Sequence, residues 1–201
     1  PYDSFIAGNK EALNTKQKKG MDLFFGKAKC AECHNGKFFT DQKFYALALP
    51  QFGPGRTRFL DPYVRDVGRM GETDKLEDAY RFRTQTLRNV ALTAPYGHNG
   101  SYATLEGIIR HHLDPINSLE NWDSSQVILP KAKWLENIDF VVLKDRLERK
   151  RLKSHLDIKP IELSENEVSE LVSFMHSLTG TNSIWGKLGK PKQVPSGLPV
   201  D

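Results

Sequence analysis

The sequence predicts a mainly α-helical fold with long loops and little β structure. Several stretches place apolar residues at helical spacing behind a capping residue, whereas residues 35–74 are rich in glycine, proline, aromatic and charged residues and show no sustained period. The length of 201 residues is sufficient for one core. We therefore expect a single domain over residues 1–180, followed by an extended C-terminal tail over residues 181–201.

The first predicted helix starts at a cap on Asn14 or Thr15, with Gln17 as capping partner, and runs to about Phe25. Its apolar face leads directly to Cys30. The aromatic residues at its end are ordinary core residues or part of a cofactor wall, and the sequence alone leaves both interpretations open.

The second predicted helix begins at a Thr104 cap and ends at Asp114-Pro115, because proline interrupts a helix. Its apolar stripe is formed by Leu105, Ile108, Ile109 and His112.

The other segments carry weaker patterns. Phe140–Leu156 predicts an amphipathic helix, and the capping box that starts at Ser164 opens a last helix that ends before Gly180. Residues 74–83 suggest a short charged helix or turn, 84–93 an extended segment, and 116–130 a polar connection.

The composition narrows the function classes. The net charge of +4 comes from 29 basic and 25 acidic residues spread along the chain, which does not favour nucleic acid but is suited to steering an acidic partner protein. The run Arg149-Lys150-Arg151 is interpreted as a solvated helix face. No apolar run approaches the ~18 residues of a membrane span, and no signal peptide is present. A hydrophobic content of 38% is low, as expected if a large buried cofactor supplies apolar surface.

The segment Cys30-Ala-Glu-Cys33-His34 is a C-x-x-C-H motif, which is typical of covalent c-type haem attachment. Two cysteines about one helical turn apart can reach the two vinyl groups of one macrocycle, and the adjacent histidine can bind its iron. A zinc site would need four ligands, but Cys30 and Cys33 are the only cysteines in the chain. The motif therefore predicts a cytochrome c-type domain with one covalent haem c and His34 as the proximal ligand.

The second axial ligand is a choice among several residues. His112 lies on the apolar stripe of the second predicted helix, while His111 points about 100° away, so the period favours His112. His111, Met70, Met175 or an open site are the alternatives.

Other polar residues are candidates for the haem surroundings. His98, in the turn-rich loop from Pro95 to Gly100, faces the haem edge, an interdomain surface or solvent. Arg88, with Arg69 and Arg83 as alternatives, could pair with haem propionates, because a guanidinium fork suits a carboxylate.

At this point the chain resembles the bacterial di-haem cytochrome c peroxidase family, which includes the MauG enzymes. The motifs that carry the resemblance cover nearly the whole chain: Cys30 to Gly36, Asp66-x-Gly68-Arg69, Thr86 to Tyr96, His98-Asn99-Gly100, Thr104-Leu105-Glu106 and Phe174 to Gly180. They match the second, C-terminal half of such enzymes. The resemblance thus implies an N-terminal haem domain that this chain lacks.

The resemblance also implies roles. In the family, hydrogen peroxide reacts at the first-half haem, and the second-half haem receives electrons or stores an oxidising equivalent. The family's distal ligand on this haem is commonly methionine, or tyrosine in MauG, and the matching position here is His112. Two imidazoles give a lower potential than histidine with methionine. This departure puts in doubt a simple role as the high-potential entry haem.

The same resemblance implies further cofactors and partners. Family members hold a calcium ion between domains, partly through main-chain oxygens that match Thr93 and Pro95; this chain would supply half of that site. Phe25 and Tyr96 are expected to line the haem. We expect a periplasmic electron-transfer domain of a peroxidase that takes electrons from a small cytochrome c or cupredoxin, with a homodimer left open. The alternatives are a MauG-like oxidase that modifies a partner protein, or a stand-alone mono-haem electron carrier.

Overall fold

A computed structural model describes residues 1–53, 65–127, 129, 133–134, 138–185 and 194–196. The α-helices are α1 (Tyr2–Ile6), α2 (Thr15–Phe25), α3 (Met70–Thr73), α4 (Leu105–Leu113), α5 (Pro115–Asn121), α6 (Val141–Lys144), α7 (Arg146–Ser154), α8 (Glu165–Ser177) and α9 (Thr181–Trp185). Short 3-10 helices are η1 (Cys30–Glu32), η2 (Leu76–Asp78), η3 (Val90–Leu92) and η4 (Ser124–Gln126). The strands are β1 (Phe44–Ala46) and β2 (Arg81–Arg83).

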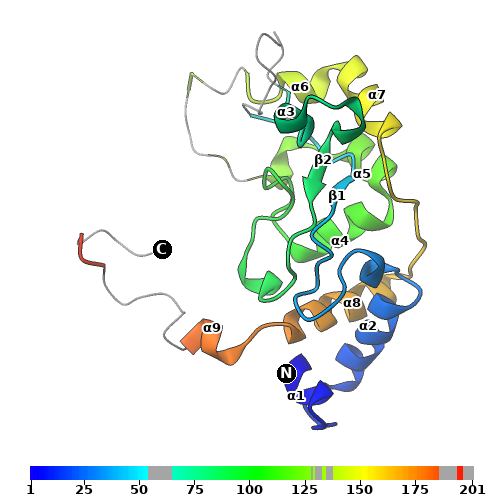
Figure 1. The fold of residues 1–201 in the computed structure, drawn as a ribbon, viewed down its shortest axis with the longest axis vertical. Helices are drawn as coiled ribbons and strands as arrows, with labels where there is room; N and C mark the ends of the chain where they lie inside the picture. Colours follow the sequence, from blue (N-terminus) through cyan, green and yellow to red (C-terminus); the bar gives the residue numbers. More distant parts are fainter. Residues whose placement is uncertain (54–64, 128, 130–132, 135–137, 186–193, 197–201) are drawn as a thin grey trace.

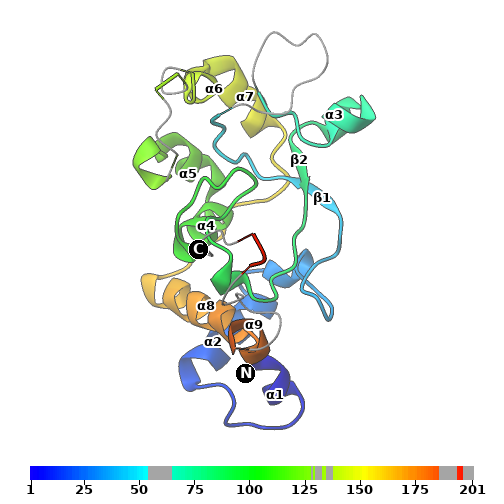
Figure 2. The ribbon, with the colours of Figure 1, turned by 90° about the vertical axis from the view of Figure 1, so that its left-hand side faces the viewer.

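The predicted fold class is confirmed, because within the described residues β structure amounts to one two-stranded sheet and two isolated bridges. β1 pairs antiparallel with β2, with Tyr45 opposite Phe82. Figures 1 and 2 show α1, α2 and α8 at one end of the molecule, α4 and α5 in the middle with the sheet, and α6 and α7 at the other end. Within the described part of the chain, no helix has the length and apolar character needed to cross a bilayer.

The helix pair α2–α8 forms the firmest contact of the fold. Both helices start with a complete capping box, Asn14 with Gln17 and Ser164 with Glu167, as predicted. Gly20 lets the helices approach closely, since a Cβ atom there would lie 1.9 Å from the carbonyl oxygen of Glu170. This crossing fixes the segment that leads from α2 into Cys30.

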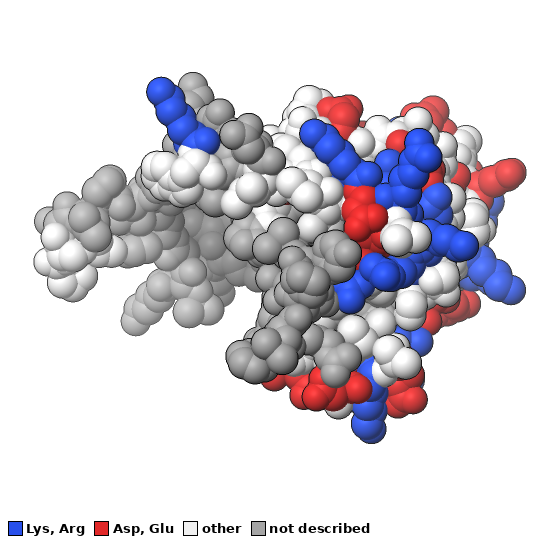
Figure 3. All heavy atoms as spheres, turned by 90° about the horizontal axis from the view of Figure 1, so that it is seen from above, with Lys and Arg blue, Asp and Glu red and all other residues white. Residues whose placement is uncertain are grey.

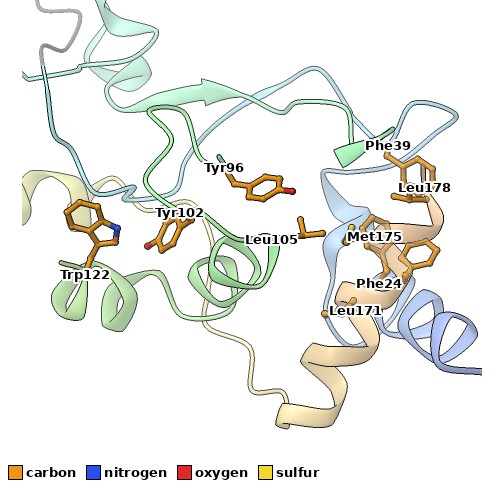
Figure 4. Packing of buried hydrophobic residues seen from close by; sticks show 11 residues of the cluster. Phe24, Phe39, Tyr96, Tyr102, Leu105, Trp122, Leu171, Met175 and Leu178 are labelled. Atoms are coloured by element: carbon orange, nitrogen blue, oxygen red, sulfur yellow. The ribbon is translucent and has the colours of Figure 1, made fainter. Parts of the chain in front are cut away.

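One aromatic core extends from this crossing toward α4. Figure 4 shows Phe24, Phe39 and Met175 gathered between α2 and α8, with Tyr102 and Trp122 at the far end near α4 and α5. A second, smaller cluster lies under the sheet and α7, and consists of Ala46, Ala48, Val67, Met70, Ala79, Tyr80, Leu119 and Leu152.

Some predicted elements differ from the structure. Pro115 does end α4, but it also occupies the first position of α5, where its missing N–H costs nothing, and Asp114 caps that helix by accepting a hydrogen bond from the Asn117 N–H at 3.1 Å. The predicted helix Phe140–Leu156 is two helices, since Asp145 caps α7 and interrupts the run.

The remaining connections contain more local structure than predicted. The segment 84–93, predicted to be extended, contains η3, and residues 74–83 hold η2 and β2. In the predicted tail, residues 181–185 form α9, while 186–193 and 197–201 lie outside the described residues.

The basic run of α7 is compensated by acidic residues. Arg149 and Lys153 pair with Glu120 of α5, and Arg151 pairs with Glu148 at 3.2 Å. Figure 3 shows positive and negative side chains interspersed on the face seen from above. This arrangement agrees with a solvated face.

Candidate haem site

The turn η1 holds the C-x-x-C-H motif immediately after α2. Lys29 precedes it in the left-handed conformation (φ 55°), and the Cys30 carbonyl accepts hydrogen bonds from the Cys33 N–H at 3.3 Å and the His34 N–H at 2.9 Å. Both cysteines are free thiols. Burial raises the pKa of the Cys30 thiol to about 12 and also raises that of Cys33, so both thiols are protonated at neutral pH.

His34 is held as a neutral imidazole. Its Nδ1 lies 3.1 Å from the carbonyl oxygen of Phe39. A carbonyl can only accept, so Nδ1 carries the proton and the Nε2 lone pair is the one suited to a metal. Burial, reinforced by the neighbouring His112, lowers the pKa of His34 to about 4. Neutral imidazole is the metal-binding form.

His112 shows the same arrangement from α4. Its Nδ1 lies 2.8 Å from the Ile108 carbonyl and must donate, and no hydrogen bond joins Nε2 to any group in the described chain. Burial lowers the pKa of His112. His112 lies close enough to His34 to lower the pKa of that residue. The fold thus brings the two imidazoles near each other from distant parts of the chain.

His111 is engaged on both ring nitrogens. Its Nε2 donates to the Leu47 carbonyl at 2.8 Å, and its Nδ1 accepts from the Tyr102 hydroxyl at 2.9 Å. The Tyr102 oxygen in turn bonds Ser118 at 2.6 Å. His111, which lies off the apolar stripe, is 0% exposed, whereas His112 on the stripe is only partly covered. Because these partners satisfy both ring nitrogens, the polar His111 side chain can face the core although it does not lie on the apolar stripe of α4.

The two methionines named as alternatives lie in packed clusters. Met70 is buried in the cluster under the sheet, and Met175 is buried among the aromatic residues of the α2–α8 crossing. The choice among His112, His111, Met70 and Met175 therefore stays a prediction.

The chemistry of this region fits a covalently bound haem. Two free thiols, two neutral imidazoles and a partly covered apolar face of Ile108 and Ile109 on α4 lie in one part of the fold. This face packs against the aromatic core and keeps part of its apolar surface exposed.

The predicted haem-wall residues lie at different depths. Tyr96 is buried in the aromatic core and donates its hydroxyl proton to the Val90 carbonyl at 3.0 Å. Phe25 is 50% exposed at the end of α2, with its ring 6.4 Å from that of Phe39. Neither position tests a contact with haem.

The polar candidate residues Arg88 and His98 make hydrogen bonds to other groups of the protein. Arg88 donates to both oxygens of Asp3 at 2.7 Å and to the Lys37 carbonyl, next to the haem-attachment loop. His98 Nε2 lies 3.0 Å from Asp66 Oδ2, and its ring stacks on Phe82 at 3.9 Å between centroids.

The two other arginines lie at the sheet. Arg69 lies over the ring of Phe44, and Arg83 donates to Gln42 and Gln85. Neither contact involves the C-x-x-C-H turn.

The loop proposed for calcium lies between η3 and α4. The Thr93 hydroxyl donates to the Val90 carbonyl at 3.0 Å, and Pro95 follows a cis peptide bond. Among the described residues there is no group of three or more His, Cys, Asp or Glu side chains that could hold a metal. The predicted half-site depends on main-chain oxygens and stays a prediction.

The structure also reveals a side chain that sequence reasoning missed. The Tyr45 hydroxyl donates to Asp41 Oδ2 at 2.7 Å, and the Asp41 N–H donates to the Cys33 carbonyl at 2.9 Å. The only signal in the sequence was the short separation from the C-x-x-C-H motif, and the turn that joins Tyr45 to Cys33 through Asp41 is not visible there.

Together, the helical fold and the C-x-x-C-H turn define a c-type cytochrome domain. No protein-family model matches the chain. Among curated proteins, the chain is 37% identical over 129 residues to cytochrome-c peroxidase IdrP1 of Pseudomonas sp. (strain SCT), which is 54% of this chain and 34% of that protein. It is 39% identical over 110 residues to cytochrome c peroxidase Ccp of Escherichia coli K12, covering 55% of this chain and 23% of that protein. It is 27% identical over 179 residues to the methylamine utilization protein MauG of Methylorubrum extorquens, covering 89% of this chain and 38% of that protein.

Solved structures give the same result. A MauG-like protein associated with microbial copper homeostasis matches with a TM-score of 0.60 and 26% identity over 92% of this chain and 53% of that one. The di-haem peroxidase BthA of Burkholderia thailandensis matches in fold, with a TM-score of 0.59 and 19% identity, over 100% of this chain and 49% of that one. The resemblance is therefore confirmed: the relatives of this chain are di-haem cytochrome c peroxidases and MauG proteins. The chain spans roughly a third or less of the length of the first two curated relatives.

Proposed function

We propose that this chain is the C-terminal electron-relay domain of a periplasmic di-haem peroxidase, with one haem c bound covalently through Cys30 and Cys33. His34 and His112 would bind its iron. The observation that carries the proposal is the pairing of the C-x-x-C-H turn with a neutral, Nδ1-protonated imidazole from α4. The haem would supply one-electron exchange between Fe(II) and Fe(III).

The residues of the chain have defined tasks in this relay. The Phe39 and Ile108 carbonyls hold the two imidazoles in one tautomer and orientation, as the partners of haem-ligating histidines do. The apolar side chains around them keep water from the site. Two imidazoles favour ferric iron more than a methionine ligand would, so the relay would work at a lower potential.

The wider setting of the proposal comes from the relatives. A second haem domain, outside this chain, would reduce hydrogen peroxide to water, and a small cytochrome c or cupredoxin would supply the electrons. Because thioether attachment takes place outside the cytoplasm, we place the protein in the periplasm. Calcium bound through Thr93 and Pro95 at the domain boundary remains part of this proposal.

The ligand assignment is tested by the absorption and EPR spectra of the ferric haem protein. We expect a low-spin spectrum without the near-infrared band of sulfur ligation. His112→Ala should convert the haem to an open, high-spin site. The matched control His111→Ala should keep the low-spin spectrum, because His111 bonds Leu47 and Tyr102. A low-spin spectrum that survives in His112→Ala would refute the assignment.

The function itself is tested on the full-length protein. Turnover of hydrogen peroxide with a reduced small cytochrome or copper protein is expected. Lack of turnover by a protein that contains both haems would count against a peroxidase. A precursor without a second C-x-x-C-H motif would instead favour the stand-alone carrier.

A MauG-like oxidase is the second candidate function, and it is supported by the length of the alignment with MauG. The similarity to MauG extends over 89% of this chain, whereas the similarity to the peroxidases IdrP1 and Ccp covers 54% and 55%. Mass spectrometry of a co-purified partner protein after peroxide addition distinguishes the two. Covalent oxidation of partner side chains without turnover of a small donor would establish the oxidase.

A further inference from the structure

Tyr45 lies between the C-x-x-C-H turn and a cleft at the protein surface. It is the central residue of β1, where it pairs with Phe82, and its side chain is half-buried. Its hydroxyl donates to the Asp41 carboxylate at 2.7 Å, and the Asp41 N–H donates to the Cys33 carbonyl at 2.9 Å, so Tyr45 is joined to the C-x-x-C-H turn through Asp41. In a c-type haem the Cys33 sulfur is bonded to the macrocycle, so Asp41 and Tyr45 would lie beside the haem edge.

Asp41 is fixed as a proton acceptor for this hydroxyl. Its N–H donates to the Cys33 carbonyl at 2.9 Å, and its Oδ1 accepts from the Lys43 N–H at 2.9 Å. Burial raises the pKa of the Asp41 carboxyl, but hydrogen bonds from Lys43, Tyr45 and Thr84 outweigh burial and hold the pKa below its ordinary value. The carboxylate is therefore ionised and aimed at the Tyr45 proton.

The other side of Tyr45 opens on a cleft. The cleft has a volume of about 380 Å³ and is lined by Gln42, Lys43, Phe44, Tyr45, Arg69, Asp78 and Arg81. Arg69 is paired with Asp78 at 3.4 Å and Arg81 with Asp157 at 2.9 Å, so among the described residues Lys43 is the cation of this lining without an ion pair. The volume suits a small molecule, and Lys43 favours an anionic one.

From this geometry, and resting on the proposed function, we propose that Tyr45 is a redox-active relay between the haem and a small anionic reductant in the cleft. In the peroxide-oxidised haem protein, the Tyr45 hydroxyl would give up one electron toward the haem and its proton to the Asp41 carboxylate. Tyr45 would become a neutral phenoxyl radical, and the haem would supply the oxidising equivalent that it received from hydrogen peroxide. The anionic reductant then returns an electron to the Tyr45 oxygen, and Asp41 returns the proton.

The test is EPR of the full-length haem protein, frozen shortly after addition of hydrogen peroxide, with ring-deuterated tyrosine to identify the radical. A tyrosyl signal is expected, with loss of that signal in Tyr45→Phe. Ascorbate, used as the anionic reductant, should quench the signal in the wild type. Asp41→Asn keeps an acceptor oxygen for Lys43 but cannot take the proton, so it should lower the radical yield.

Tyr2→Phe is the matched control. For Tyr2 the structure gives ring contacts with Phe39 and Phe174 and no hydrogen bond from its hydroxyl, so its loss should leave the signal unchanged. The resting haem spectrum of each variant shows whether the protein has folded. A haem spectrum that responds to peroxide without a tyrosyl signal, or with a signal that persists in Tyr45→Phe, would overturn the relay and leave the proposed function intact. A haem spectrum that does not respond to peroxide would overturn both.

Discussion

The apolar residues of the α2–α8 crossing are more deeply buried than those on the exposed side of α4. At the crossing, Phe24 and Phe174 are 0% exposed, and Gly20 brings the backbones into contact. On α4, Ile108, Ile109 and His112 are only partly covered, although they form the apolar stripe of that helix. The side chains at the crossing are fully buried, whereas those of the α4 stripe keep part of their surface exposed.

This difference predicts which region of the domain is stable without a cofactor and which region a cofactor would stabilise. The crossing can hold the C-x-x-C-H turn in place before any cofactor is attached, since its packing depends only on side chains present in the chain. The α4 face also packs against the aromatic core, and its remaining exposed surface would gain further apolar contacts from the proposed haem. Four substitutions test this division, in order of decreasing effect.

Phe174→Ala should have the largest effect, because it empties the centre of the aromatic core at the crossing. We expect a loss of about 3–5 kcal/mol in the free energy of unfolding, measured by urea denaturation. Phe38→Ala is the control, because Phe38 is 63% exposed and its loss should change stability by less than about 0.5 kcal/mol. Equal losses in the two variants would show that the crossing is not the stable region.

Gly20→Ala tests the close approach of α2 to α8. The new Cβ would lie 1.9 Å from the Glu170 carbonyl oxygen, which forces the helices apart and should cost about 1–3 kcal/mol in the same measurement. At Gly180, the nearest contact of a new Cβ would be an ordinary 3.5 Å from Ser183 Oγ. Gly180→Ala should therefore be close to neutral, and a loss that matches Gly20→Ala would contradict the clash.

Ile108→Ala probes the α4 stripe directly. In a haem-free chain, made by replacing Cys30 and Cys33 with serine, Ile108→Ala should cost about 1–2 kcal/mol, because Ile108 is mostly but not fully covered. In the haem-bound protein the loss should be larger, because the cofactor would cover the remaining surface. The same loss with and without haem would show that the cofactor does not pack on this face.

Glu165→Gln should have the smallest effect, although it breaks the contact between the two regions. Arg110 of α4 donates to both Glu165 oxygens, at 3.0 and 2.5 Å, and this lowers the pKa of Glu165 from 4.5. The stabilisation from a lowered carboxyl pKa is present above pH 4.5 and is lost as the pH falls through the folded-state value. Because Glu165 is exposed, the change in the midpoint of acid unfolding should be small.

The comparison for this ion pair is Glu11→Gln, which removes an exposed carboxylate outside both regions. Acid-unfolding midpoints followed by circular dichroism should differ between Glu165→Gln and the wild type, but not between Glu11→Gln and the wild type. A large shift in Glu165→Gln would mean that the pair contributes more than an exposed contact normally does.

The predicted helices were most accurate where local signals agree. α2, α4 and α8 begin at the predicted caps on Asn14, Thr104 and Ser164, because a cap and the apolar period after it are both written in adjacent residues. The prediction was wrong where one residue serves two elements. Pro115 ends one helix and starts the next, and Asp145 divides a continuous amphipathic pattern by capping its second half.

The sequence by itself determined the chemistry of this protein: a C-x-x-C-H motif, its position after a capped helix, and a histidine on the stripe of a second helix. Only the tertiary structure decided which groups meet. It turned His111 inward onto Tyr102 and Leu47, brought His112 near His34, and joined Tyr45 to the Cys33 backbone through Asp41. The reason is physical. Caps and periods act within a few residues, whereas these contacts depend on how distant segments satisfy buried polar groups around one core.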